Sequence, residues 1–312
     1  MHTETPITLG QTEIRTLPLG IGTWAWGDRF FWNYGRDYTA EDIKAAFQTA
    51  VEEGITFFDT AEVYGMGRAE RFLNEMTADT QSPIVIATKF FPFPWRVRRA
   101  AMRRALRQSL KRLGRSQVDL YQIHFPWPPR STDFWVSTLG DLVQEGLVKA
   151  AGVSNYNAEQ MRRAHAILQA KGIPLASNQV HYSLLHRDPE KNGVLHACQE
   201  LGITLIAYSP LEMGLLTGKY SPENPPGGVR NRRYSREYLA RILPLIGLMR
   251  EIGQGHGGKT PAQVALNWVI CKGALPIPGA KNARQAQSNA GALGWRLTDD
   301  EVAALDQASE GL

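Results

Sequence analysis

The chain has 312 residues, which is long for an ordinary domain but normal for one α/β barrel with insertions. Its composition, 43% hydrophobic and 21% charged, is globular, and no apolar run reaches the roughly 18 residues that a membrane helix needs. The net charge of +5 fits basic surface helices, because no nucleic-acid fold signature accompanies it. We therefore expect a single domain, residues 1–312, without a nucleic-acid or membrane partner.

The N-terminal residues and the cysteines indicate in which cellular compartment the protein is expected. The first residues, MHTETPITLG, are too polar for a signal peptide. The two cysteines, Cys198 and Cys271, both fall in segments with a helical pattern. We expect them to be buried free thiols in a reducing environment, and we expect the protein to be cytoplasmic.

Apolar, β-branched runs alternate with amphipathic segments along the whole chain. Residues 7–20 predict a hairpin of two short strands around Leu9 and Gly10. Eight strands are then expected at residues 17–22, 55–59, 84–89, 118–124, 148–155, 176–182, 204–210 and 274–279. Helical patterns follow them at residues 40–54, from 69, 96–114, 131–146, 158–172, 192–202 and from 282.

Eight strand–helix units favour a (β/α)8 TIM barrel with an N-terminal β-hairpin. A doubly wound open sheet is the alternative, but it usually has fewer strands and a glycine-rich first turn. The segment after the seventh strand, residues 209–238, is a large loop whose Pro-Pro-Gly-Gly and arginine-rich part does not suit regular structure. Loops of this size are more often functional or mobile than structural.

Residues 253–260, GQGHGGKT, match the phosphate-binding pattern G-x-x-x-x-G-K-[ST]. A P-loop follows a strand, whereas the preceding segment, LARILPLIGLMREIG, has apolar residues at helical spacing. Thr260 is instead expected to cap a helix that begins at Pro261. The sequence therefore disfavours a P-loop nucleotide hydrolase.

Two other short patterns have an ordinary interpretation. GIGTWAWG lacks the third glycine of a dinucleotide fingerprint and is better interpreted as a loop leaving the first strand. His181, His186, His196 and Cys198 lack the spacing of a zinc site. We expect no bound metal.

Four polar residues lie at or just beyond predicted strand ends: Asp59, Tyr64, Lys89 and His124. Active sites of TIM barrels are built where the carboxyl ends of the strands meet. A tyrosine at that mouth, with a lysine, a carboxylate and a histidine beside it, is equipped to protonate a carbonyl oxygen.

The chain resembles the aldo-keto reductase superfamily from about residue 17 to residue 289. The resemblance rests on FFDTAEVYG, the strand-ending Lys89, LYQIH, GVSNY, NQVHYSLL, AYSPL, LLTGKY and PIPGAK, which occur in the order of that family's motifs. It implies reversible hydride transfer that reduces aldehydes or ketones to alcohols with a nicotinamide dinucleotide.

The resemblance also implies roles for the four residues. Tyr64 would be the general acid, and the Lys89 ammonium would lower its pKa from the ordinary value of about 10. Asp59 would pair with Lys89 and offset the cost of its burial. His124 would hydrogen-bond the substrate oxygen and orient it.

The cofactor residues implied by the resemblance are Thr23, Trp24, Asp59, Ser154, Asn155, Gln179, Tyr208, Ser209, Leu211, Lys219, Gly279, Lys281, Gln285 and Asn289. Ser154, Asn155 and Gln179 would hold the carboxamide, and Tyr208 would stack on the nicotinamide. A cation at Lys281 can meet a 2′-phosphate by charge-assisted hydrogen bonds, so NADPH is expected over NADH. The family pattern is broken at Ser288, where many members carry Glu.

Aromatic residues crowd the loops after the first, third and fourth strands. Such a concentration predicts an apolar pocket for a small-molecule carbonyl substrate. The expected lining residues are Trp24, Trp26, Phe90, Phe125 and Trp127. The short C-terminal segment after Asn289 predicts an open, permissive site. A nucleotide-binding regulatory or redox-sensing subunit on the same fold is the alternative, because fold does not fix function.

Overall fold

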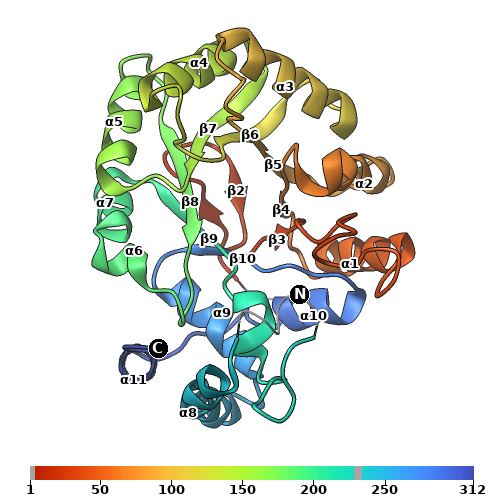
Figure 1. Ribbon diagram of the computed structural model, residues 1–312, viewed down its shortest axis with the longest axis vertical. Coiled ribbons are helices and arrows are strands. Elements are labelled where there is room, and N and C mark those ends of the chain that lie inside the picture. The colour runs from red at the N-terminus through yellow and green to blue at the C-terminus, as the bar shows by residue number, and fades with distance from the viewer. Residues whose placement is uncertain (1–3, 228–233) are drawn as a thin grey trace.

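The computed structural model describes residues 4–227 and 234–312, in which eight parallel strands form a barrel surrounded by helices (Figure 1). The strands follow chain order around the barrel, and each pairs with the next. A parallel bridge between Gly22 and Gly279 joins the first strand to the segment directly after the last. This architecture confirms the (β/α)8 barrel. The barrel strands are β3 (Ile21–Gly22), β4 (Phe57–Asp59), β5 (Val85–Phe90), β6 (Val118–Ile123), β7 (Val148–Ser154), β8 (Leu175–His181), β9 (Thr204–Tyr208) and β10 (Leu275–Ile277).

Helices cover the outside of the barrel, and polar caps fix where several of them begin. Thr39 and Asp42 form a capping box at the start of α1, which stabilises the first turn. The helices are α1 (Ala40–Glu52), α2 (Arg68–Thr77), α3 (Arg99–Leu113), α4 (Thr132–Gln144), α5 (Ala158–Gln169), α6 (Asp188–Lys191), α7 (Val194–Leu201), α8 (Arg236–Gly255), α9 (Pro261–Cys271), α10 (Ala283–Ala290) and α11 (Asp299–Ala308), with 3-10 turns at η1 (Tyr64–Gly67) and η2 (Glu212–Thr217).

The N-terminal hairpin, β1 (Ile7–Thr8) and β2 (Arg15–Thr16), lies across one end of the barrel (Figure 1). Between its strands, Leu9 is fully buried and packs with inward-facing strand residues such as Phe57 and Leu120. Gly10 has a φ of +57°, and a Cβ there would lie 2.5 Å from the carbonyl oxygen of Ala176. The predicted hairpin is confirmed, although its turn extends beyond Leu9 and Gly10 because Leu9 is drawn into the barrel. The site is thereby left to the opposite end.

The arginine-rich helix has an exposed basic face, and two of its arginines contact a neighbouring helix. Arg99 of α3 pairs with Asp141 of α4 at 3.1 Å, and Arg103 pairs with Glu145 at the C-terminal end of α4. These contacts join two neighbouring outer helices. Each exposed pair contributes little to stability, so these contacts are a minor tie between the two helices.

The P-loop-like segment does not have P-loop structure. It begins in the last turn of α8 and not after a strand, and Lys259 Nζ donates a hydrogen bond to the carbonyl oxygen of Gly291 at 3.2 Å. Thr260 and Gln263 form a capping box at the start of α9, with Pro261 in its first turn as predicted. The segment is therefore a helix connection, and the phosphate-binding interpretation is excluded on structural grounds.

The large loop after β9 contains the 3-10 turn η2, which positive φ values at Met213 and Gly214 interrupt. The arginine-rich residues 228–233 lie outside the described part of the chain. Within residues 4–227 and 234–312, no helix is both long and apolar enough to cross a membrane. Both cysteines are free thiols as expected, but only Cys198 in α7 is buried, whereas Cys271 at the end of α9 is half-buried.

Candidate active site

Four polar side chains from neighbouring strands meet at the barrel mouth. Asp59 ends β4, Lys89 is the penultimate residue of β5, His124 directly follows β6, and Tyr64 begins the turn after β4. Lys89 Nζ lies 2.5 Å from Asp59 Oδ1 and 3.4 Å from the Tyr64 hydroxyl. The ring centroids of Tyr64 and His124 are 6.0 Å apart. The structure thus brings together the four residues that the sequence placed at separate strand ends.

Two glutamine side chains complete the surroundings of Asp59. Gln122 and Gln179 each donate an Nε2 hydrogen bond to Asp59 Oδ2, at 3.2 Å and 2.7 Å. All three residues are buried, and the donors offset the cost of burying the carboxylate. Sequence reasoning missed Gln122, although it lies two residues before His124 on β6. Alternate residues of a strand share a face, so this signal was present.

Burial and charge act in opposite directions on Tyr64 and Lys89. Burial raises the pKa of the Tyr64 phenol, Lys89 lowers it and Asp59 raises it, and the pKa ends above its ordinary value. The lowering expected from Lys89 is therefore present but outweighed by burial. Burial lowers the pKa of Lys89, but Asp59 and then Tyr64 raise it by more. At neutral pH Tyr64 is a hydroxyl donor and Lys89 is an ammonium.

His124 is neutral at physiological pH. Burial first, and then the charge of Lys89, hold the pKa of His124 well below its usual range. A neutral imidazole has one donor and one acceptor nitrogen. Its backbone is fixed on both sides, because its N–H donates to Phe90 O at 2.9 Å and its C=O accepts from Asn155 Nδ2 at 3.0 Å. The neutral ring is thereby held in place and can donate or accept a hydrogen bond.

A cavity of about 680 Å³ opens beside these residues, with Asp59, Tyr64 and His124 in its wall. Lys89 is fully buried and does not line it. Thr23 does not line it either, because the residue is fully buried and its Oγ1 donates to the carbonyl oxygen of Asp59 at 2.9 Å. The other expected cofactor residues that line the cavity are Trp24, Ser154, Asn155, Gln179, Tyr208, Ser209, Leu211, Lys219, Gly279, Lys281, Gln285 and Asn289.

Hydrogen bonds order the cavity wall formed by β7, β8 and β9. Ser154 Oγ donates to the carbonyl oxygen of Gln179 at 2.8 Å. The Tyr208 hydroxyl donates to Asn155 Oδ1 at 3.1 Å, so the Tyr208 ring is held at both its backbone and its tip. This wall therefore presents amide groups and one flat ring in fixed positions.

Three cations line the cavity: Lys219, Lys281 and Arg284. Among its described lining residues the only carboxylate is Asp59, which is paired with Lys89. Arg284 lies in the first turn of α10, and sequence reasoning missed it although it follows Lys281 by three residues. This distribution of charge suits an anionic ligand.

The cavity also has room for a ligand against the backbone. Gly279 lies in its wall, and a Cβ added there would meet nothing closer than Gly22 O at 3.8 Å. A flat ring, amide groups, three cations and an open backbone edge are the features that a nicotinamide dinucleotide needs. The described residues therefore fit that cofactor.

The loop after β9 has an unusual backbone. Ser209, Glu212 and Met213 have φ values of 52°, 46° and 50°, a region that residues with a side chain rarely occupy. Each such residue costs about 1–3 kcal/mol and persists only where its surroundings hold it. The loop supplies the cavity residues Ser209, Leu211 and Met213, so its conformation shapes the wall.

Only part of the predicted substrate pocket lies at the cavity. Trp24 and Phe125 line it, as does Trp32 from the same aromatic cluster. Trp26 and Phe90 do not, because both side chains are fully buried in the core. Trp26 Nε1 donates to Ala280 O, and Phe90 packs on Trp135 with ring centroids 4.8 Å apart. Trp127 stacks on Phe125 at 4.2 Å, outside the lining itself.

Comparison with known proteins agrees with this architecture. Residues 18–310 match the Aldo/keto reductase family. The chain belongs to this family. Membership makes it an oxidoreductase, and enzymes of the family typically use NAD(P)H. The family match spans every strand of the barrel and all four of the residues that meet at its mouth.

Three similar proteins illustrate the family. A protein named pyridoxal reductase, chloroplastic, from Arabidopsis thaliana is 41% identical over 307 residues, covering 94% of this chain and 83% of that protein. An uncharacterized oxidoreductase of Mycobacterium tuberculosis is 41% identical over 297 residues, covering 93% and 88%. A solved aldo-keto reductase from Klebsiella pneumoniae, in complex with NADPH, is 28% identical with a TM-score of 0.76, covering 98% of this chain and 95% of that one.

Proposed function

We propose that the protein reduces an aldehyde or ketone to an alcohol with NADPH, by a reversible hydride transfer. The observation that carries the proposal is the Tyr64 hydroxyl in the cavity wall with Lys89 Nζ 3.4 Å behind it. A general acid has to lie within hydrogen-bond reach of the atom that it protonates. Among the described residues that line the cavity, Tyr64 is the one whose hydroxyl lies next to a buried cation.

Tyr64 donates its proton to the carbonyl oxygen as that oxygen becomes an alkoxide. Burial raises its pKa, so the proton is present throughout the neutral range. Lys89 then stabilises the phenolate that remains, because an opposite charge close by favours the ionised form. Asp59 holds Lys89 in place, with Gln122 and Gln179 as its other donors.

His124 orients the substrate. Because its imidazole is neutral, a ring N–H can donate to the carbonyl oxygen without competing for the proton of Tyr64. The two ring centroids are 6.0 Å apart, and both residues line the cavity. Two donors to one oxygen stabilise the charge that develops on it.

NADPH supplies the hydride when bound. Tyr208 and the amides of Asn155 and Gln179 would hold the nicotinamide, and Lys219 would hold the pyrophosphate. Lys281 and Arg284 would face the adenosine end and its 2′-phosphate. The NADPH complex of the similar Klebsiella protein supports this choice of cofactor. Thr23 is left out of this set, because it contacts the backbone of Asp59 and not the cavity.

An aromatic aldehyde is the substrate class that we propose. Trp24, Trp32 and Phe125 present flat apolar surfaces to the cavity, and aromatic side chains favour flat partners. The name of the Arabidopsis relative, pyridoxal reductase, supports pyridoxal as the first compound to test. A cytoplasmic location and the lack of a nucleic-acid partner stay predictions from the sequence.

The direct test is NADPH oxidation with pyridoxal, benzaldehyde and a panel of aliphatic aldehydes. The reaction is followed by loss of nicotinamide absorbance and by identification of the alcohol formed. We expect turnover with at least one aldehyde and higher kcat/KM for the aromatic ones. Binding of NADPH without turnover of any aldehyde would contradict the proposal and favour a regulatory subunit.

Cofactor choice is tested by Lys281→Ala. Loss of a charge-assisted hydrogen bond to the 2′-phosphate should raise the Kd of NADPH about 10-fold or more and leave that of NADH within about 3-fold. Both are measured by titrating the quenching of tryptophan fluorescence. Lys259→Ala is the matched control, because this lysine lies outside the cavity and bonds to Gly291 O. Equal losses for the two dinucleotides would show that Lys281 does not meet the 2′-phosphate.

A further inference from the structure

A buried carboxylate lies next to the cavity without lining it. Glu212 follows β9, is 6% exposed, and contacts His181 Nε2 at the end of β8. Its Oε1 also accepts a hydrogen bond from Ser183 Oγ at 2.9 Å. These contacts offset the cost of burying the carboxylate, and they tie the loop after β9 to the neighbouring strand. The mechanism above makes no use of them.

His181 is at the same time part of a stack of three flat rings. Its ring lies 3.9 Å from that of His186 and 5.3 Å from that of Tyr208, with an angle of 11° in each case. Tyr208 lines the cavity, whereas the two histidines do not. One face of the Tyr208 ring is thereby backed by His181, and the position of His181 is fixed by Glu212.

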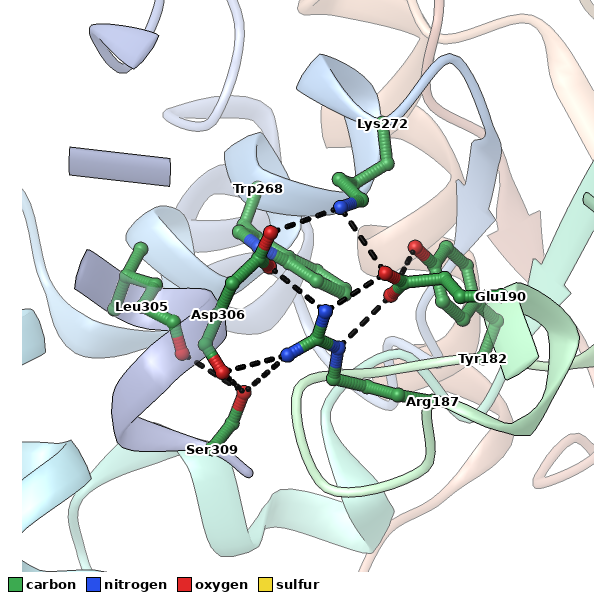
Figure 2. A network of polar contacts seen from close by, with 8 residues as sticks. All are labelled: Tyr182, Arg187, Glu190, Trp268, Lys272, Leu305, Asp306 and Ser309. Atoms are coloured by element: carbon green, nitrogen blue, oxygen red, sulfur yellow. Dashed lines mark hydrogen bonds and ion pairs between the residues drawn. The ribbon is translucent and has the colours of Figure 1, made fainter. Parts of the chain in front are cut away.

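The segment after β8 is anchored on its other side. Figure 2 shows a polar network in which Tyr182 and Arg187 both donate to Glu190 Oε1 at 2.9 Å. Arg187 also pairs with Asp306 of α11 at 3.3 Å. His181 directly precedes Tyr182, so it belongs to a part of the chain that the outer helices hold in place.

The turn around Glu212 is held partly by local contacts. The backbone hydrogen bonds there run within the loop, from Glu212 N–H to Ser209 O and from Gly214 N–H to Leu211 O, both at 2.9 Å. Glu212 and Met213 also hold left-handed φ values, which their surroundings must maintain. The side chain of Glu212 is a polar link from this turn to the anchored strand and to Ser183.

We propose that Glu212 and His181 are positioning residues for the dinucleotide site. Glu212 keeps the loop after β9 in the conformation that lines the cavity, and His181 sets the plane of the Tyr208 ring. The pair acts on cofactor affinity and not on proton transfer, because its contacts run to Tyr208 and to the loop after β9 and not to Tyr64 or His124. This inference rests on the proposed function, in which Tyr208 and the loop hold NADPH.

The test compares Glu212→Ala, Glu212→Gln and His181→Phe with the wild-type protein. We expect Glu212→Ala to raise the Kd and KM of NADPH about 10-fold, which is the cost of losing a buried hydrogen bond to a charged group. The kcat at saturating NADPH should stay within about 3-fold of the wild-type value. Glu212→Gln keeps the size and the oxygen acceptor for Ser183, so it should recover part of the affinity. His181→Phe keeps a flat ring behind Tyr208 but loses the link to Glu212, and should resemble Glu212→Ala.

Two comparisons separate a positioning role from a purely structural one. Glu301→Gln removes the carboxylate of another histidine–glutamate pair, with His256 at 2.9 Å, which does not line the cavity. It should leave the Kd of NADPH unchanged even if the melting temperature falls. The double variant Glu212→Gln with His181→Phe should bind NADPH no more weakly than the worse of the two single variants, because both substitutions remove the same interaction.

The two proposals fail in different ways. If the wild-type protein does not bind NADPH, the proposed function is wrong. If the wild-type protein binds NADPH, and the Glu212→Ala and Glu212→Gln variants fold and bind it with the wild-type Kd, the positioning role is overturned. A loss of kcat in Glu212→Gln with an unchanged Kd of NADPH would also overturn it, since the pair would then act on the chemistry.

Discussion

Tyr64→Phe is expected to lower kcat for carbonyl reduction by about 10³-fold, within the range that general acid catalysis contributes. The phenyl ring keeps the contacts of the Tyr64 ring with His124, so the shape of the cavity is preserved. The substitution removes the hydroxyl that lies next to Lys89, which is the only such proton donor among the described residues of the cavity wall. The measurement is the rate of NADPH oxidation with the best aldehyde of the panel, together with the Kd of NADPH, which should change little.

Tyr121→Phe is a matched control for this substitution. Tyr121 is a fully buried tyrosine of β6 that lies outside the cavity, and its hydroxyl has no hydrogen-bond partner among the described residues. Removing that hydroxyl should leave kcat unchanged. If Tyr64→Phe kept the wild-type kcat, Tyr64 would not be the acid and another donor, such as His124, would have to protonate the oxygen.

The fold follows closely from local patterns in the sequence. Short apolar runs between amphipathic segments indicate buried parallel strands with outer helices, and the structure has a strand in each of the predicted ranges. The helix start at Pro261 was predictable from Thr260 as a cap. The length of the hairpin turn was not, because Leu9 leaves the local pattern to pack with residues such as Phe57 and Leu120.

The part of the site that lies at the ends of adjacent strands could be predicted from the sequence. Asp59, Lys89 and His124 lie near one another because adjacent parallel strands finish at the same rim. Phe90 was misplaced although the signal was present: successive strand residues face opposite sides, so Phe90 points away from the side that Lys89 takes. Trp26 was not predictable, since its partner Ala280 is distant in the sequence.

The contribution of Glu212 could not be predicted from the sequence. Its left-handed backbone is a property of the folded loop, and its partner His181 lies on another strand. The motif around it, AYSPLEMGLL, suggests a loop near the cofactor but not the direction of the side chain. Histidines 181 and 186 suggested a metal site only weakly, and the structure shows that they stack on each other and on Tyr208.

Asp59→Asn is expected to destabilise the protein by about 3–5 kcal/mol, because it leaves the buried Lys89 ammonium without its charged partner. Both side chains are almost fully buried, so water cannot replace the lost carboxylate. The free energy of unfolding is measured by urea denaturation at pH 7. Lys89→Met should cost less than Asp59→Asn, since Gln122 and Gln179 continue to donate to Asp59.

The double variant Asp59→Asn with Lys89→Met separates stability from activity. Replacing both members of a buried ion pair by uncharged groups of similar size is often neutral, so most of the lost stability should return. We expect no carbonyl reduction by the double variant, because Tyr64 then lacks the cation that stabilises its phenolate. A double variant no more stable than Asp59→Asn alone would show that the cost comes from altered hydrogen bonding to Gln122 and Gln179 and not from an unpaired charge.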